Sequence, residues 1–151
     1  MTSIKLAVKV ISLLILILIF VKVFFPFYRI GSGSMEPTLS EGDVIIVSRY
    51  HYKFFKPKRR EIVLIDPASG VFSKGTLAHR VIAVSGDRVI IANDRVAVNG
   101  DEIEYSVLNN ARPTDLVVPR DNIFQKGDNP ETRTYGLVNQ EFIVGKVLFY
   151  F

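Results

Sequence analysis

The chain has 151 residues, a formal net charge of +4 and no cysteine. The lack of cysteine excludes a disulfide framework, a thiolate nucleophile and cysteine-ligated zinc. Once an apolar N-terminal segment is set aside, roughly 120 residues remain, which is enough for one hydrophobic core but not for two. We therefore expect one domain held together by packing alone, without a metal or another cofactor.

The N-terminal segment, residues 7–28, is predicted to be a transmembrane helix. Its residues from Val10 to Val21 carry no charge, and Lys9 and Lys22 lie near its ends. A helix needs about 20 residues to cross the hydrocarbon, so both lysines must extend toward the membrane interfaces. A cleavable signal sequence also has a basic start and a short apolar stretch, but the aromatic residues that follow this stretch favour an uncleaved anchor.

The predicted anchor comprises residues 1–29, and residues 30–151 form the predicted folded domain. Positive charge barely decides the orientation, because lysines precede the apolar stretch while Lys22 and Arg29 follow it. The balance favours a cytoplasmic N-terminus with the folded domain on the other side of the membrane.

After the anchor the chain is rich in short Val and Ile segments bounded by Gly, Asp, Asn or Pro, which is the pattern of β-strands. Asn93-Asp94 and Asn99-Gly100 are turn signals, and residues 101–118 are expected to form a surface excursion. The predicted fold is mainly β, with a single transmembrane helix followed by a compact all-β domain in the form of a small barrel, sandwich or coiled sheet. The expected strands are residues 43–48, 61–65, 79–84, 88–92, 95–98 and 142–149.

A basic run from Lys56 to Arg60 is the main cluster of positive charge. It is interpreted as a solvated turn or as a contact with the anionic surface of a lipid bilayer. Aromatic residues are not interleaved with the basic ones, so nucleic acid is not expected as a partner.

Two segments could supply a nucleophile and a base. Ser32 and Ser34 lie among glycines that permit an exposed hydroxyl and nearby backbone N–H donors for an oxyanion, although a flexible linker has the same composition. His79 begins a strand, and a serine hydroxyl needs a base whose pKa is near neutrality, although a lone histidine is usually structural. His51 lies among aromatic and basic residues and is interpreted as structural.

A third segment, Lys126 to Arg133, is a polar turn that contains Asp128 and Glu131. Either carboxylate could accept a hydrogen bond from the Nδ1–H of an imidazole and leave Nε2 to take the serine proton. The alternative is a solvated turn in which Glu131 and Arg133 form a weak surface pair.

Together the three segments resemble the conserved boxes of the type I signal peptidase family, and the resemblance covers nearly all of the chain after Tyr28. The matching residues are Ser32-Gly-Ser-Met-Glu-Pro-Thr-Leu39, His79-Arg-Val-Ile82 and Gly127-Asp-Asn129 with Glu131-Thr-Arg133. The resemblance implies a single-pass serine endopeptidase of the plasma membrane with its catalytic domain on the extracytoplasmic side. Its substrates would be exported preproteins, whose signal peptides it would remove after small residues at Ala-x-Ala sites.

The same resemblance implies that Ser34 is the nucleophile and His79 the general base, with the hydroxyl of Ser32 and the N–H of Ser34 forming the oxyanion hole. Most bacterial members have lysine at the position of His79, whereas the endoplasmic-reticulum, archaeal and some spore-former enzymes have histidine. A histidine has a reference pKa of about 6.5 and needs orienting rather than desolvation, so activity is expected to fall below about pH 6. The orienting partner would be Asp128, which matches the branch in residue type, or Glu131, which replaces a later Asp in a shortened box.

Two other functions are considered. A self-cleaving repressor would share the β-fold and a serine nucleophile, but it would be cytosolic, use lysine and bind DNA, so the anchor and His79 argue against it. A non-catalytic assembly factor for pili or secreted proteins would hold its partners without cleaving them, and the presence of both Ser34 and His79 argues against that. The sequence indicates neither the individual substrates nor the oligomeric state.

Overall fold

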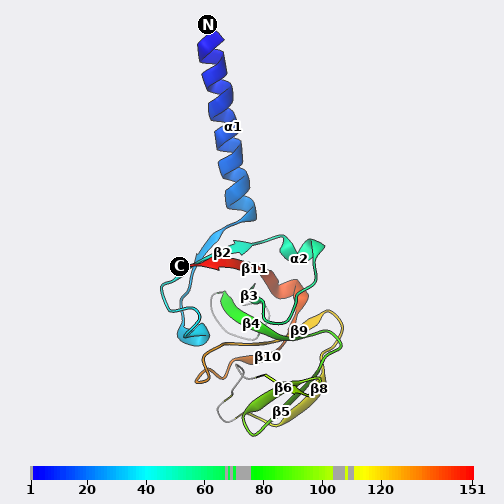
Figure 1. Cartoon of the computed structure of the whole chain (residues 1–151). Coiled ribbons are helices and arrows are strands. Elements are labelled where there is room, and N and C mark those ends of the chain that lie inside the picture. The colour runs from blue at the N-terminus through cyan, green and yellow to red at the C-terminus, as the bar shows by residue number, and fades with distance from the viewer. Residues whose placement is uncertain (1, 67, 69, 71–75, 104–107, 109–110) are drawn as a thin grey trace.

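The structure is a computed structural model that describes residues 2–66, 68, 70, 76–103, 108 and 111–151. The helix α1 (Thr2–Phe24) projects from a β-rich body in Figure 1. The described helical segments after α1 are short, namely α2 (His51–Phe54) and the 3-10 turns η1 (Gly33–Met35) and η3 (Gln140–Phe142). The prediction of a mainly β chain with one N-terminal apolar helix is confirmed.

The helix α1 is long and apolar enough to cross a membrane, judged by its length and composition. It begins and ends earlier than the predicted helix of residues 7–28, and it stops at Phe24 because the ring of Pro26 restricts the preceding residue and has no N–H to continue a helix. The ring of Phe24 lies 4.8 Å from the ring of Tyr50, and the backbone N–H of Arg49 donates to the carbonyl oxygen of Phe24. The end of the helix is thus attached directly to the β-rich body.

The larger sheet has seven strands in the order β1-β2-β11-β3-β4-β9-β10, and every neighbouring pair is antiparallel. Its end strands are β1 and β10, so the described residues form no closed barrel, and the arrangement is the coiled-sheet alternative of the prediction. The strands are β1 (Phe27–Arg29), β2 (Val44–Ser48), β3 (Ile62–Ile65), β4 (Leu77–Val84), β9 (Asn122–Lys126), β10 (Tyr135–Asn139) and β11 (Ile143–Tyr150).

A smaller sheet, with strand order β7-β6-β5-β8, lies at the end of the body opposite to α1 in Figure 1. The turn between β5 and β6 has positive φ angles at Asn93 (50°) and Asp94 (61°), which confirms the turn expected there. Two of these strands, β7 and β8, lie within residues 101–118, so the expectation of a surface excursion is wrong for them; residues 104–107, 109 and 110 lie outside the described part. The strands are β5 (Arg88–Ala92), β6 (Arg95–Val98), β7 (Asp101–Glu102) and β8 (Thr114–Val117).

The hydrophobic core fixes η1 against the larger sheet. Met35, at the end of η1, is 1% exposed and belongs to one buried cluster with Ile45 of β2 and Leu64 of β3. A second cluster joins β4 and β9 to the smaller sheet through Phe124 and its neighbours. Strand β4 therefore takes part in both clusters and β9 in the second, so side chains near their paired ends are held in place by packing.

Candidate active site

Ser34, in the turn η1, and Ser32, directly before it, line a cleft of about 700 Å³. The Oγ of Ser34 lies 3.3 Å from the Oγ of Ser32. Asn129 belongs to the third segment, Lys126 to Arg133, here called the C-terminal box, and it holds this turn in place. Its N–H donates to the carbonyl oxygen of Ser34 at 3.0 Å and its Nδ2 to that of Gly33 at 2.9 Å. The described structure thus brings the first and third polar segments of the sequence together.

His79 lies directly beneath this turn, on β4. It is fully buried and faces Val63 across the β3–β4 pair. The turn η1 and strand β4 both approach Gly127. A Cβ atom added to Gly127 would lie 2.3 Å from the carbonyl oxygen of Ser34 and 3.1 Å from Nε2 of His79. Only glycine permits this close approach, which explains why a glycine directly follows β9.

The hydrogen bonds of His79 define its tautomer. Its Nδ1 bonds to Oε1 of Gln125, while Nε2 has no hydrogen-bond partner among the described residues. An amide oxygen can only accept, so the single proton of the neutral imidazole lies on Nδ1 and the lone pair lies on Nε2. This is the tautomer that a general base needs if it is to take a proton from serine through Nε2.

The surroundings of His79 keep the ring neutral. Burial lowers the pKa of His79 to about 4, the positive charge of Lys126 also lowers it, and the Gln125 bond and the charge of Asp128 oppose the shift. The ring is therefore unprotonated at neutral pH. The loss of activity that the sequence predicted below about pH 6 is accordingly expected at lower pH.

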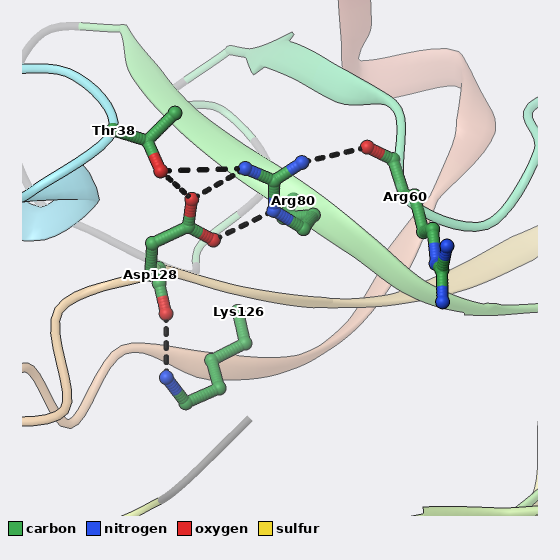
Figure 2. A network of polar contacts seen from close by, with 6 residues as sticks. Thr38, Arg60, Arg80, Lys126 and Asp128 are labelled. Carbon is green, nitrogen blue, oxygen red and sulfur yellow. Dashed lines mark hydrogen bonds and ion pairs between the residues drawn. The ribbon is translucent and has the colours of Figure 1, made fainter. Parts of the chain in front are cut away.

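Asp128 belongs to a different network, which Figure 2 shows. Its carboxylate accepts hydrogen bonds from Nε of Arg80 at 2.8 Å and from Oγ1 of Thr38 at 2.6 Å, and Arg80 also donates to the carbonyl oxygen of Arg60 at 2.8 Å. Lys126 is buried beside it and donates from Nζ to the carbonyl oxygen of Gly127 at 2.6 Å. Asp128 thereby ties the C-terminal box to β4 and to the residues after η1.

The alternation of side chains along a strand explains this separation. Arg80 pairs with Lys126 and Val81 with Gln125 in the β4–β9 register. Paired residues share a face of the sheet and neighbours along a strand lie on opposite faces, so Gln125 shares the face of His79 while Lys126 shares that of Arg80. The chain continues past β9 in the same sense, with Gly127 against His79 and Asp128 against Arg80.

Glu131, the second predicted carboxylate, is exposed, and its backbone N–H donates to Oδ1 of Asn129 at 2.9 Å. Sequence reasoning had assigned no role to Asn129, Gly127 or Gln125. A signal for Gln125 was present, since it is a polar residue directly after the apolar pair Ile123-Phe124 of a strand whose last four residues are all buried. The spacing alone did not show which side chain it would contact.

Comparisons with known proteins identify the family of the chain. The family described as "Signal peptidase, peptidase S26" matches residues 3–151. Signal peptidase IB of Staphylococcus aureus is 30% identical over 149 residues, covering 82% of this chain and 76% of the relative. A probable signal peptidase I-2 of Synechocystis sp. is 30% identical over 134 residues, covering 81% of this chain and 61% of the relative.

Among solved structures, a signal peptidase I from Enterococcus faecalis V583 matches with a TM-score of 0.47 at 25% identity, covering 63% of this chain and 98% of that chain. The family match and the curated relatives each cover more than two thirds of the chain. The chain therefore belongs to the peptidase S26 signal peptidases, the serine endopeptidases that remove signal peptides.

Proposed function

We propose that this chain removes signal peptides from exported preproteins with Ser34 as nucleophile and His79 as general base. The observation that carries the proposal is that Nε2 of the buried, neutral His79 lies next to the turn that holds Ser34 and has no hydrogen-bond partner within the described part of the chain. A serine hydroxyl is a weak nucleophile until a base takes its proton, and an imidazole in this tautomer is suited to that task.

The reaction follows from these groups. Nε2 of His79 takes the proton of Ser34 as its Oγ attacks the scissile carbonyl carbon, and the oxyanion is held by the hydroxyl of Ser32 and the N–H of Ser34. The imidazolium then returns the proton to the leaving amine, which becomes the N-terminus of the mature protein. Water, deprotonated by the same Nε2, attacks the ester on Ser34 and releases the signal peptide with a free carboxylate. The 3.3 Å separation of the two hydroxyl oxygens supports the role of Ser32.

A small pocket beside Ser34 supports cleavage after small residues of the Ala-x-Ala type. The centre of a water-sized sphere can move in it over only about 10 Å³, and the pocket lies against the buried side chains of Ile45, Leu64 and Ala78. This is about the room that one water molecule needs, so the pocket suits a group as small as a methyl and excludes larger side chains by overlap. We therefore propose that alanine is preferred at the positions that enter it.

The surface near α1 supports a lipid bilayer as the second partner. Large exposed apolar side chains include Phe27 of β1 and, at the C-terminal end of β11, Phe149, Tyr150 and Phe151. Figure 1 shows β1, β2 and the C-terminus next to the end of the helix. Aromatic residues in this position are typical of a membrane interface, so we propose that residues 1–29 anchor the peptidase domain, residues 30–151, with this surface touching the lipid.

The location of the substrate supports an orientation for the domain. Preproteins are cleaved after they have crossed the membrane, so we propose that the peptidase domain lies on the extracytoplasmic side of the plasma membrane. The tether would then raise the local concentration of the enzyme at substrates held in the same bilayer.

A direct test uses the detergent-solubilised full chain, a preprotein with an Ala-x-Ala site, and the Ser34→Ala variant. Wild type is expected to release the signal peptide, with the new N-terminus at the predicted site, and Ser34→Ala is expected to lose at least about 1,000-fold in rate. If wild type binds the preprotein without cleaving it, the chain is a non-catalytic assembly factor. If Ser34→Ala cleaves at the wild-type rate, Ser34 is not the nucleophile.

A further inference from the structure

The side chain of Gln125 is placed by the fold at the back of the imidazole of His79. Gln125 is 0% exposed and lies opposite Val81 of β4, which is two residues from His79 on the same face of the sheet. Its Oε1 bonds to Nδ1 of His79, and the two side chains come from parts of the sequence that are far apart. The contact therefore depends on the β4–β9 register rather than on local sequence.

The charged groups near His79 do not take this position. Lys126 and Asp128 affect the ring through their charge, but Lys126 donates to the carbonyl oxygen of Gly127 and Asp128 is engaged by Arg80. Across the other strand pair, the residue opposite His79 is the apolar Val63. The contact at Nδ1 is thus made by a neutral amide.

The side-chain amide of Gln125 contacts the imidazole of His79 but does not belong to a wider polar network among the described residues. Nε2 of Gln125 is buried and has no acceptor among the described residues. An unsatisfied buried N–H group is unfavourable, so a glutamine that served only the core would be expected to satisfy both ends of its amide. Leucine or methionine would fill the same space without this cost.

We propose that Gln125 is the positioning residue of this peptidase and takes the role that the sequence assigned to Asp128 or Glu131. Its Oε1 accepts a hydrogen bond from the Nδ1–H of His79 and so fixes the orientation of the imidazole ring. The same bond keeps the proton on Nδ1 and leaves Nε2, next to the turn of Ser34, unprotonated. This inference rests on the proposed function, because it concerns the base of the same reaction.

A neutral acceptor has a chemical consequence that a carboxylate does not. An amide orients the imidazole but adds no negative charge to stabilise the imidazolium, so the ring stays a weak base that works at lower pH. A carboxylate in the same place would favour the protonated ring and move its titration upward. Replacement of Gln125 by glutamate therefore changes the charge at Nδ1 while retaining an acceptor of nearly the same shape.

The test is the pH dependence of kcat/KM for preprotein cleavage by the full chain in detergent, from about pH 4 to about pH 9. In Gln125→Glu the acid limb is expected to move upward by about one pH unit or more, because the new charge favours the imidazolium. In Gln125→Leu, which lacks an acceptor, kcat/KM is expected to fall at least about tenfold across the whole range. If Gln125 only supported the fold, the acid limb of Gln125→Glu would stay at its wild-type pH, and Gln125→Leu would not cleave more slowly than Gln125→Glu.

Matched controls are Asp128→Asn and Glu131→Gln, which remove the predicted carboxylates with little change of shape. Whatever their effect on rate, neither control is expected to move the acid limb upward. Asp128→Asn removes a charge that raises the pKa of His79, so any shift in this variant is downward, opposite to that of Gln125→Glu. The proposal is overturned if the limb of Gln125→Glu does not move, if Gln125→Leu cleaves at the wild-type rate, or if a control shifts the limb as far as Gln125→Glu.

A second measurement does not depend on turnover or on the folding of a Gln125 variant. The ¹⁵N chemical shifts of His79 in the full-length Ser34→Ala protein at neutral pH are expected to show a protonated Nδ1 and an unprotonated Nε2. A proton on Nε2 would overturn the proposal. Wild type and Ser34→Ala assayed together keep the two hypotheses separate: cleavage that does not need Ser34 refutes the proposed function, whereas Ser34-dependent cleavage with an unmoved limb refutes only the role of Gln125.

Discussion

The environment of a single side chain, His79, determines how this site works. The ring is buried, contacts a neutral amide at one nitrogen and leaves the other without a partner among the described residues. Its pKa of about 4 means that almost every molecule holds the neutral form at neutral pH. At neutral pH the imidazole is therefore ready to accept a proton, although it is a weak base and holds the transferred proton weakly.

The same burial predicts a dependence of stability on pH. The pKa of His79 is about 4 in the folded chain and about 6.5 when unfolded. Between these values the unfolded chain binds a proton at this position and the folded chain does not, so stability falls as the pH is lowered. The free energy of unfolding is expected to lose about 1.4 kcal/mol per pH unit from this group, and the loss is complete below the folded value.

Urea unfolding of wild type and His79→Gln in detergent, on a background of Ser34→Ala to prevent self-cleavage, measures this contribution. The difference in stability between the two proteins should shift in favour of the variant as the pH is lowered from neutrality to about 4.5. Parallel pH dependences would contradict the assignment of a neutral, buried ring.

At the level of elements, the site depends on how the end of β9 meets the turn η1. Gly127 is the contact point, with the carbonyl oxygen of Ser34 only 2.3 Å from where a Cβ atom would lie. Gly127→Ala must therefore displace the turn that carries Ser34. We expect at least about a tenfold loss of kcat in preprotein cleavage, because small displacements of reacting groups are costly.

Gly145→Ala, in β11, is the matched control for this prediction, since a Cβ atom added there would lie a similar 2.4 Å from the carbonyl oxygen of Ser48 in β2. It should lower the melting temperature in the same way but retain kcat at temperatures where the protein is folded. Equal losses of kcat in both variants would indicate a general loss of structure and contradict a specific displacement of Ser34.

The comparison of sequence and structure is clearest for these elements. The Val- and Ile-rich segments predicted β2 to β6 and β11, because alternating or continuous short apolar runs are typical of buried strands. Strands β1, β7, β8 and β10 were not predicted, since they are short or carry polar and glycine residues such as Asp115 and Gly136. Composition shows whether a segment is buried but not which strand it pairs with.

The same limit applies to the site. Ser34 and His79 could be singled out because their residue types and the order of the boxes indicate a serine peptidase. The contact between His79 and Gln125 could not, because it follows from a register between β4 and β9 that includes a shift between Val81 and Ala83. A change of register by one residue would have exchanged the faces of Gln125 and Lys126.

At the scale of the whole molecule, the proposed orientation predicts which residues are accessible from outside the cell. Because the chain has no native cysteine, single introduced cysteines can test this by labelling. Arg120 lies between β8 and β9 with a side chain 93% exposed. In intact cells, Arg120→Cys is expected to react with a membrane-impermeant thiol reagent, while Lys5→Cys at the other end of α1 should react only after lysis. The reverse pattern would place the peptidase domain in the cytoplasm.

The central claim is that Ser34 and His79 act as one catalytic unit, and the rates of Ser34→Ala, His79→Ala and the double variant test it most directly. Groups that act as a unit give losses that do not add, since removal of either one already abolishes the shared step. All three variants are predicted to cleave the preprotein at the same residual rate, at least about 1,000-fold below wild type. A double variant that is slower than wild type by the product of the two separate losses, and therefore slower than either single variant, would contradict the claim.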